Sequence, residues 1–361
     1  MKNFIYSKSL NTISKIKGNP FYLILFVNDK CPNNCLHCWY NNEWKRDNIV
    51  GKNLSYDELK KISESINKLE FLTLTGGEAF LRDDIEDIAE VFVKNTKTRR
   101  LDITTSGFDS ELISKRIINI LNKINGTPFR VDVSLDGLEE THNLIRQNKN
   151  AFRNAVSTIQ SLNDIKKQYS NFDSSIITTI SKYNINEVDK LSEYIDEIMP
   201  EGEWMVNIVR SNTPAPIATK DEITAYKKAH EYIDARHKLS PGDVGHKLGK
   251  WLTAKNSLRR EIIIDTVENG KNHLNCAAGS LSGVIFNDGD VRACETLTDS
   301  LGNIKDFNYD LKKVWNNNKA KELRRKIQYT NCSCTHECYL SVSILIQPIC
   351  VMKLIMKRLT L

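Results

Sequence analysis

The sequence is organised around Cys31-Pro-Asn-Asn-Cys35-Leu-His-Cys38-Trp-Tyr, in which three thiols lie within eight residues. An apolar run with the pattern of a buried strand, Phe21 to Val27, comes shortly before it. Three thiolates can bind three irons of a cubane and leave the fourth iron without a protein ligand, and an open position distinguishes a reactive metal site from a closed structural one. The stretch therefore predicts a 4Fe-4S cluster with one free iron, ligated by Cys31, Cys35 and Cys38.

A structural zinc site is the alternative for the same loop. Structural zinc usually takes CxxC pairs and four ligands, and the loop holds no fourth cysteine. His37 is the remaining ligand candidate inside the loop, and we expect it to pack rather than to bind metal. The spacing favours the iron-sulfur cluster.

Length, charge and cysteine usage limit the class of protein. The chain has 361 residues, 40% of them hydrophobic, which is enough for one large α/β domain and a smaller appendage. Its 51 basic and 45 acidic residues form no long block of one sign, so we expect no nucleic-acid partner. The start lacks the apolar core of a signal peptide, and no window is long enough to span a bilayer. We therefore expect a cytoplasmic protein, in which nine cysteines indicate metal ligation rather than disulfides.

Strand and helix patterns alternate along the first 210 residues. Helical patterns lie at 55–69, opened by the capping box Ser55-Tyr-Asp-Glu58, and at 110–124, 139–146, 152–169 and 185–198. Buried-strand patterns lie at 21–27, 71–75, 101–105, 129–135, 174–180 and 204–209. This order predicts an α/β fold with a parallel sheet curled into a partial (β/α)6 barrel, because the later sequence does not supply the two further units of an eight-stranded barrel.

Polar motifs follow the strands, at the edge where such folds build their sites. The second strand ends in Thr75-Gly76-Gly77-Glu78, where the glycines allow a close backbone approach to a ligand and Glu78 offers a carboxylate to an ammonium group. Taken alone, Gly-Gly-Glu is also a common turn. The third strand ends at Ser106-Gly107, and the fourth ends at Ser134-Leu135-Asp136-Gly137.

A second group of cysteines lies at the other end of the chain. It follows a Pro-rich linker signal at 211–216 and helical patterns at 222–236 and 245–260. Its members are Cys276, Cys294, Cys332, Cys334, Cys338 and Cys350. Asn287-Asp-Gly289 predicts a hairpin that brings Cys276 and Cys294 together, and a helix at 311–327 returns the chain to the later thiols. These thiols form a plausible four-thiolate cage for a further cluster.

The order of CxxxCxxC, Gly-Gly-Glu and the later cysteines resembles that of radical S-adenosylmethionine (radical SAM) enzymes with a C-terminal twitch or SPASM extension. The resemblance covers roughly Phe21 to Tyr339. It implies that S-adenosylmethionine (SAM) chelates the free iron of the cluster through its amine and carboxylate. It also implies an oxidoreductase activity, in which reductive cleavage of SAM yields a 5'-deoxyadenosyl radical that abstracts hydrogen from a substrate.

The resemblance assigns roles to single positions in the barrel. The Gly76–Glu78 segment corresponds to the family motif that binds the amine of SAM, and Ser134 is the hydroxyl expected to meet its ribose or carboxylate. Arg146 resembles a basic position in the same region, with a solvated helix arginine as the alternative. Ser106 is a cofactor candidate at a position where the family often has Asn, a departure that weakens the case for a side-chain contact.

The resemblance also implies at least one auxiliary 4Fe-4S cluster. Two auxiliary cubanes need about eight protein ligands, and six thiols lie outside the barrel loop, so we predict one complete cluster. Its predicted ligands are Cys276, Cys294, Cys338 and one of Cys332 or Cys334. A second, incomplete cluster that uses Cys350 is the less favoured alternative, because Ile349-Cys-Val-Met is more typical of a buried apolar thiol.

The implied partners are a flavodoxin or ferredoxin reductant and a peptide or small-molecule substrate, oxidised with the auxiliary cluster as electron acceptor. About 20 residues precede the first strand, so we expect no independent peptide-recognition domain there. A non-enzymatic iron-sulfur electron carrier or scaffold is the rival interpretation. An electron carrier or scaffold would need no site for the amine or the ribose of SAM. A role of Glu78 and Ser134 in binding SAM would therefore distinguish the enzyme from the carrier.

The apolar run 341–361 carries three basic residues near its end and contains Pro348. We expect a C-terminal helix packed over the barrel, with a helix on an acidic membrane surface as the less favoured alternative. The predicted division is an N-terminal extension, the barrel, a helical linker region, the auxiliary-cluster subdomain and a helical tail, at 1–20, 21–210, 211–275, 276–340 and 341–361.

Overall fold

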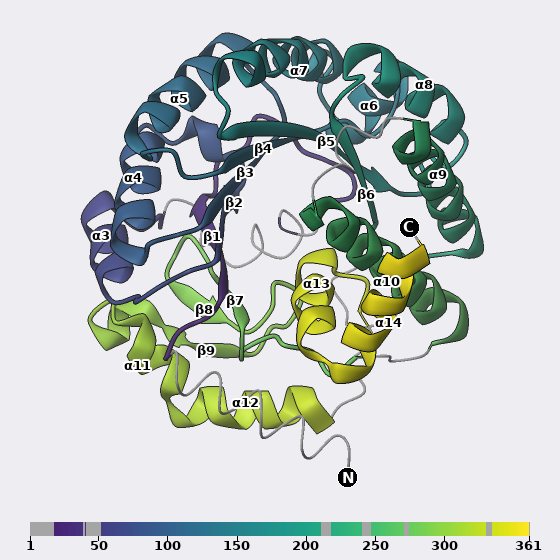
Figure 1. Ribbon diagram of the computed structural model, residues 1–361. Coiled ribbons are helices and arrows are strands. Elements are labelled where there is room, and N and C mark those ends of the chain that lie inside the picture. Colours follow the sequence, from purple (N-terminus) through teal and green to yellow (C-terminus); the bar gives the residue numbers. More distant parts are fainter. Residues whose placement is uncertain are drawn as a thin grey trace.

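The structure is a computed structural model that describes residues 18–38, 40, 52–210, 218–239, 247–270, 274–329 and 334–360. Its strands form a single nine-stranded sheet in the order β6-β5-β4-β3-β2-β1-β7-β8-β9. Figure 1 shows this sheet curving into a ring, with helices around its outer face. The expected partial barrel of α/β class is therefore present.

Six parallel strands form the barrel part of the sheet. They are β1 (Tyr22–Asn28), β2 (Phe71–Gly76), β3 (Arg100–Thr105), β4 (Phe129–Ser134), β5 (Phe172–Ile180) and β6 (Glu203–Ile208). The helices between them are α3 (Tyr56–Glu64), α4 (Ile85–Thr96), α5 (Ser110–Lys123), α6 (Glu139–Arg146), α7 (Ala151–Gln168) and α8 (Val188–Ile198), with a short 3-10 helix, η1 (Ala79–Leu81), before α4. Each crossover returns the chain to the same end of the sheet, which is what parallel pairing requires.

The two faces of the barrel strands differ in chemistry. On β3, Leu101 and Ile103 are fully buried, and Arg100 and Asp102 alternate with them. Because successive side chains of a strand point to opposite faces, the apolar set packs under the outer helices and the polar set faces the barrel interior. The same alternation on β4 turns Arg130, Asp132 and Ser134 inward. The interior is therefore polar along these two strands.

Helix α3 begins as predicted and ends earlier than predicted. The Ser55 hydroxyl accepts the N–H of Glu58 at 3.3 Å, and the Glu58 carboxylate accepts the N–H of Ser55 at 2.8 Å, which completes the capping box. The helix stops at Glu64 instead of Leu69. Leu69 is fully buried and donates its N–H to the carbonyl of Thr96, so a tertiary contact draws these residues out of the helix.

The C-terminal hairpin extends the barrel sheet. Strands β7 (Ser282–Ile285) and β8 (Asp290–Arg292) pair antiparallel around the predicted turn, and β9 (Ser300–Asn303) follows. Strand β7 also pairs parallel with β1. Strand β1 is thereby flanked on both edges and is buried along its whole length, as its unbroken apolar sequence suggests.

Helices fill the remaining part of the ring. They are α9 (Lys220–Leu239), α10 (Lys247–Asn269), α11 (Leu311–Asn316), α12 (Asn318–Tyr329), α13 (Glu337–Ile346) and α14 (Pro348–Thr360), with the 3-10 helix η2 (Ile304–Phe307) before α11. The single helix expected at 311–327 is wrong, because Asn317 is extended and its side chain accepts the N–H of Ala320 at 2.7 Å to start a new helix. Figure 1 shows α10 and α13 between β6 and β7, where they close the ring.

The C-terminal segment packs as two helices rather than one. Pro348 begins α14, which lies against α10, where Lys357 pairs with Glu261 and Arg358 lies over the Trp251 ring at 4.7 Å. In the described ranges, no individual helix has the length and hydropathy to cross a membrane; α13 and α14 together meet that test but are bent by 94°.

Candidate active site

The cysteine loop leaves the carboxyl end of β1 and docks on the end of α6. Asn34 donates its N–H to the carbonyl of Arg146 at 3.2 Å, and Leu36 donates to the carbonyl of Ile145 at 2.9 Å. Within the loop, the N–H of Cys38 donates to the carbonyl of Cys35 at 3.1 Å. The conformation of the loop therefore depends on a helix more than a hundred residues further along the chain.

The three thiols of this loop have the chemistry that an iron-sulfur cluster requires. Cys31, Cys35 and Cys38 are all partly exposed. Burial raises the pKa of the Cys31 thiol to about 12, and the charges of Glu78, Cys35 and Cys38 add to this effect. Iron must displace that proton, as in any thiolate site. Each thiolate of a cubane binds a different iron, so the sulfurs need not converge on one point, and within the described residues no three metal-binding side chains do so.

A buried ion pair between α6 and the segment that follows β4 contacts the cysteine loop. Arg146 Nη2 lies 2.5 Å from Asp136 Oδ2, and Arg146 Nη1 donates to Cys35 Sγ at 3.5 Å. Burial opposes ionisation of Asp136, but Arg146 and His37 hold the pKa of this carboxyl below its ordinary value. The N–H of Thr179 donates to its other oxygen at 2.9 Å. Arg146 is 9% exposed, so the alternative of a solvated helix arginine is wrong.

His37 lies inside the loop beside the same carboxylate. Its Nε2 is 3.8 Å from Asp136 Oδ2, and burial lowers the pKa of the imidazole. The ring is thus held against Asp136, in agreement with a packing role.

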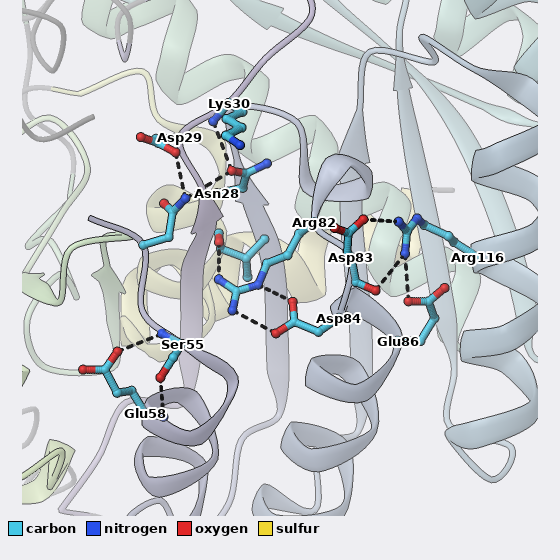
Figure 2. A network of polar contacts seen from close by, with 12 residues as sticks. Asn28, Asp29, Lys30, Ser55, Glu58, Arg82, Asp83, Asp84, Glu86 and Arg116 are labelled. Atoms are coloured by element: carbon cyan, nitrogen blue, oxygen red, sulfur yellow. Dashed lines mark hydrogen bonds and ion pairs between the residues drawn. The ribbon is translucent and has the colours of Figure 1, made fainter. Parts of the chain in front are cut away.

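The segment that enters the loop is fixed by polar contacts (Figure 2). Arg82 Nη1 donates to the carbonyl of Val27 at 2.7 Å, and its guanidinium pairs with Asp84 at 2.6 Å. The Asn28 side chain accepts the N–H of Lys30 at 3.1 Å. These contacts define the direction in which the chain leaves β1.

The Gly-Gly-Glu segment packs backbone to backbone against that same stretch. Gly77 donates its N–H to the carbonyl of Asn28 at 2.7 Å, and Glu78 donates to the carbonyl of Lys30 at 2.8 Å. A Cβ at Gly76 would lie 2.2 Å from the carbonyl oxygen of Asn28, and one at Gly77 would lie 2.3 Å from that of Lys30. Glycine is required at both positions because any side chain would separate this segment from the cysteine loop.

The Glu78 carboxylate joins the ends of β2 and β3. One oxygen accepts from Thr105 Oγ1 at 2.9 Å and from the N–H of Phe80 at 3.3 Å. The other accepts from the N–H and the hydroxyl of Ser106 at 2.8 and 2.7 Å. Burial raises the pKa of Glu78, and the bonds from Ser106 and Thr105 act against this. With the carboxylate so engaged, the backbone of this segment is the part best placed for a ligand. In the sequence, the hydroxyl pair Thr105-Ser106 at the end of the strand is a weak indication of this bond.

We expect Glu78→Ala to lower the free energy of unfolding by about 1–3 kcal/mol, because the buried donors of Thr105 and Ser106 lose their acceptor. Ser106→Ala should cost less, about 1 kcal/mol, since the Ser106 N–H keeps its bond. Denaturant titration measures both, with exposed Glu64→Ala as the control. Equal stability of Glu78→Ala and Glu64→Ala would contradict this role.

Ser134 completes the row of predicted residues at the strand ends. It is the last residue of β4, it is 9% exposed, and it alternates with the fully buried Val133. It therefore faces the barrel interior, on the strand next to β3, which Ser106 directly follows.

The later cysteines share one local arrangement. Each of three thiols accepts the backbone N–H of the residue two positions further on: Cys276 from Ala278 at 3.4 Å, Cys294 from Thr296 at 3.5 Å and Cys334 from His336 at 3.1 Å. Such bonds favour the thiolate and are a means by which proteins tune cluster potentials. This donor set fits an iron-sulfur cluster. Cys332 lies outside the described residues, so the choice between Cys332 and Cys334 stays a prediction.

The fourth thiol, Cys338, lies next to a buried polar network that the sequence did not reveal. Burial raises the pKa of Tyr22, and the charge of Cys338 adds to this effect. The same charge acts to raise the pKa of Arg210. Arg210, which follows β6, pairs with Glu337 and lies 3.3 Å from His336 Nε2. This network connects the later cysteines to the barrel. Cys350 is 4% exposed on α14, as expected for a buried apolar thiol.

Comparison with known families agrees with this arrangement. Residues 25–195 match the family model of the radical SAM superfamily, and residues 276–339 match that of the SPASM iron-sulfur cluster-binding domain. Residues 25–195 therefore form a radical SAM domain, and residues 276–339 form a SPASM domain. Domains of these two kinds use a 4Fe-4S cluster with SAM and auxiliary iron-sulfur clusters.

Particular relatives are similar over half of the chain or more. GTP 3',8-cyclase of Yersinia pestis is 27% identical over 184 residues, which are 50% of this chain and 52% of the relative, so the chain spans about half of that protein. The solved structure of anSMEcpe with bound AdoMet has a TM-score of 0.58 at 16% identity and covers 94% of this chain and 96% of its own. SuiB of Streptococcus suis, bound to S-adenosylmethionine, has a TM-score of 0.60 at 16% identity over 93% of this chain and 75% of its own. At these identities the two structures establish the fold.

Proposed function

We propose that the enzyme removes a hydrogen atom from an unactivated C–H bond of a peptide or small-molecule substrate, and that the resulting substrate radical loses one electron to the auxiliary cluster. Cys31, Cys35 and Cys38 would hold the 4Fe-4S cluster, with SAM on its free iron. When bound, this cluster supplies the electron that cleaves SAM to methionine and the 5'-deoxyadenosyl radical. The auxiliary cluster would be held by Cys276, Cys294, Cys338 and one of Cys332 or Cys334.

The observation that carries the proposal is the contact between the Gly-Gly-Glu segment and the chain that enters the cysteine loop. The bonds of Gly77 to Asn28 and of Glu78 to Lys30 join the segment to the chain that enters the cysteine loop, which supports a role for its backbone beside the proposed free iron. A ligand that chelates this iron would therefore meet carbonyl groups able to accept from its amine. An electron carrier would not need this arrangement.

The other residues of the proposed SAM site orient and shield the cofactor. Ser134 faces the interior at the end of β4 and is proposed to meet the ribose or carboxylate. Ser106, held by Glu78, occupies the neighbouring strand end. Arg146 is proposed to hold the loop through Cys35, because its ion pair with Asp136 fixes the guanidinium at that sulfur. Burial of these groups limits the access of water to the site.

The proposal includes both a peptide and a small molecule as the substrate class. One structure of SuiB holds its precursor peptide SuiA, with a TM-score of 0.60 to this chain. GTP 3',8-cyclase, by its name, acts on a nucleotide. A flavodoxin or ferredoxin is the proposed reductant, the cytoplasm is the proposed compartment, and the division at residues 20, 210, 275 and 340 is the proposed domain organisation.

The test is anaerobic turnover of the reconstituted enzyme with a one-electron reductant and SAM. The proposal predicts formation of 5'-deoxyadenosine and methionine, and transfer of deuterium from a labelled substrate into 5'-deoxyadenosine. If reduced, iron-replete protein left SAM intact with every candidate substrate, the proposal would fail.

We expect Gly77→Ala to weaken SAM binding by about tenfold or more, since the added methyl collides with the Lys30 carbonyl and moves the segment away from the cluster. Equilibrium dialysis with labelled SAM measures this. Gly126→Ala is the comparison, because nothing lies within 4 Å of the added carbon and only its left-handed backbone is strained. Unchanged SAM affinity in Gly77→Ala would exclude the segment from the site.

A further inference from the structure

A cluster of charged side chains lies inside the barrel, apart from the proposed SAM site. Arg100 and Asp102 of β3 pair at 2.8 Å, and Arg130 of β4 pairs with Asp132 at 2.8 Å and with Glu203 of β6 at 2.6 Å. All five occupy inward positions near the amino ends of their strands. We call them, together with Lys255 and Arg259 of α10, the inner charge cluster.

Helix α10 adds two cations where it closes the ring (Figure 1). Lys255 and Arg259 are one helical turn apart and therefore share a face. Burial lowers the pKa of Lys255 to about 8, the Arg259 and Arg100 cations act in the same direction, and Glu203 and the Cys338 thiol act against them. These effects place Lys255 among charges contributed by both sides of the barrel.

The cluster has more cations than its carboxylates can balance. Asp102 pairs with Arg100, while Asp132 and Glu203 both pair with Arg130. Within the described residues, Lys255 has no hydrogen bond or ion pair. The formal charge of the four cations and three carboxylates is +1. The side chains of Arg100 and Glu203 are 36% and 32% exposed, so solvent reaches one side of the cluster, and an anion that enters there would balance the excess positive charge.

Two buried hydrogen-bond donors of these cations also have no acceptor among the described residues. Arg130 is 7% exposed, and its buried Nη2 has no partner in the described residues. Arg259 donates through Nη1 to Ser341 Oγ at 3.0 Å, but its buried Nε has no partner there either. Buried donors are normally satisfied, so two such groups on neighbouring cations indicate a missing acceptor.

We propose that Lys255, Arg259 and Arg130 bind an anionic group of the substrate, a phosphate or a carboxylate, inside the barrel. This inference rests on the proposed function, because it takes the barrel interior as the substrate site. Arg and Lys are the side chains that bind such oxyanions through charge-assisted hydrogen bonds.

The position of the site suits a substrate that reaches the proposed SAM site. Arg130 and Ser134 lie on the same inward face of β4, four residues apart, which corresponds to about 13 Å along the strand. A substrate anchored by its anion at Arg130 would extend toward the carboxyl ends of the strands. The anion would thus set the position of the C–H bond relative to SAM.

The test is calorimetric titration of the anaerobically reconstituted protein with inorganic phosphate and, separately, with succinate. Lys255→Met should weaken anion binding by about tenfold or more, since it removes a charged hydrogen bond. Lys255→Arg should retain binding. The control is Lys228→Met on α9, whose lysine is exposed and pairs with Asp189. Preference for phosphate would indicate a phosphorylated substrate, and preference for succinate a carboxylate.

If Lys255→Met does not fold, a measurement on the wild-type protein tests the inference instead. Phosphate or succinate should protect Lys255 from acetylation by acetic anhydride, read by peptide mass spectrometry. The inference is overturned if neither anion binds or protects, or if folded Lys255→Met binds both as the wild type does. Basal cleavage of SAM without substrate should persist in Lys255→Met, and its absence in the wild type would refute the proposed function instead.

Discussion

Cys35→Ala should abolish formation of 5'-deoxyadenosine and remove the iron of the barrel cluster. A three-thiolate site that loses one ligand cannot hold a cubane with a single free iron. The loss should exceed the roughly 10–100-fold effect typical of removing an outer partner of a metal ligand. Iron and sulfide analysis and chromatographic detection of 5'-deoxyadenosine after anaerobic reduction measure it.

Two cysteine variants serve as controls. Cys350→Ala removes a buried thiol of α14 and should leave both iron content and SAM cleavage unchanged. Cys294→Ala should reduce the iron of the auxiliary cluster while the barrel cluster stays. Full SAM cleavage by Cys35→Ala would show that the loop is not the site of the reactive cluster.

Arg146→Met should produce the largest loss of stability outside the cysteines. It leaves Asp136 buried without its cation, and breaking a buried pair in this way costs about 3–5 kcal/mol. The thermal unfolding midpoint should fall, and the barrel cluster should be lost faster on exposure to chelator, because Arg146 also contacts Cys35 Sγ.

The matched control is Arg153→Met on α7, at an exposed position seven residues further along the chain. This variant should unfold and lose iron as the wild type does, since exposed charges contribute little. Asp136→Asn should reproduce the chelator sensitivity of Arg146→Met. If Arg146→Met matched Arg153→Met in both measurements, the supporting role of the ion pair would be wrong.

The barrel could be predicted because its signals are local. Strand β1 is an unbroken apolar run, the capping box of α3 is a four-residue motif, and α6 has the predicted bounds, Glu139–Arg146. The errors arose where distant contacts decide the local structure. Leu69 leaves the helical pattern to bond Thr96, which ends the predicted helix early. The pairing of β7 with β1 joins segments about 250 residues apart, and no local pattern predicts it.

In the candidate site too, local motifs could be predicted from the sequence and long-range contacts could not. The spacing of Cys31, Cys35 and Cys38 identifies ligands because one loop carries all three. The pairing of Arg146 with Asp136, the bond of Glu78 to Ser106 and the contact of Arg210 with Glu337 join segments far apart in sequence. No local pattern encodes such pairs, so sequence reasoning named some of these residues but not their partners.

The central claim is that the loop of Cys31, Cys35 and Cys38 holds a cluster whose free iron binds SAM. Its most direct test is the electron paramagnetic resonance spectrum of the anaerobically reduced Cys276→Ala/Cys294→Ala variant, in which the barrel cluster is the expected source of signal. The account predicts a 4Fe-4S spectrum that changes when SAM is added. A spectrum that SAM leaves unaltered, or the absence of a 4Fe-4S signal, would contradict it.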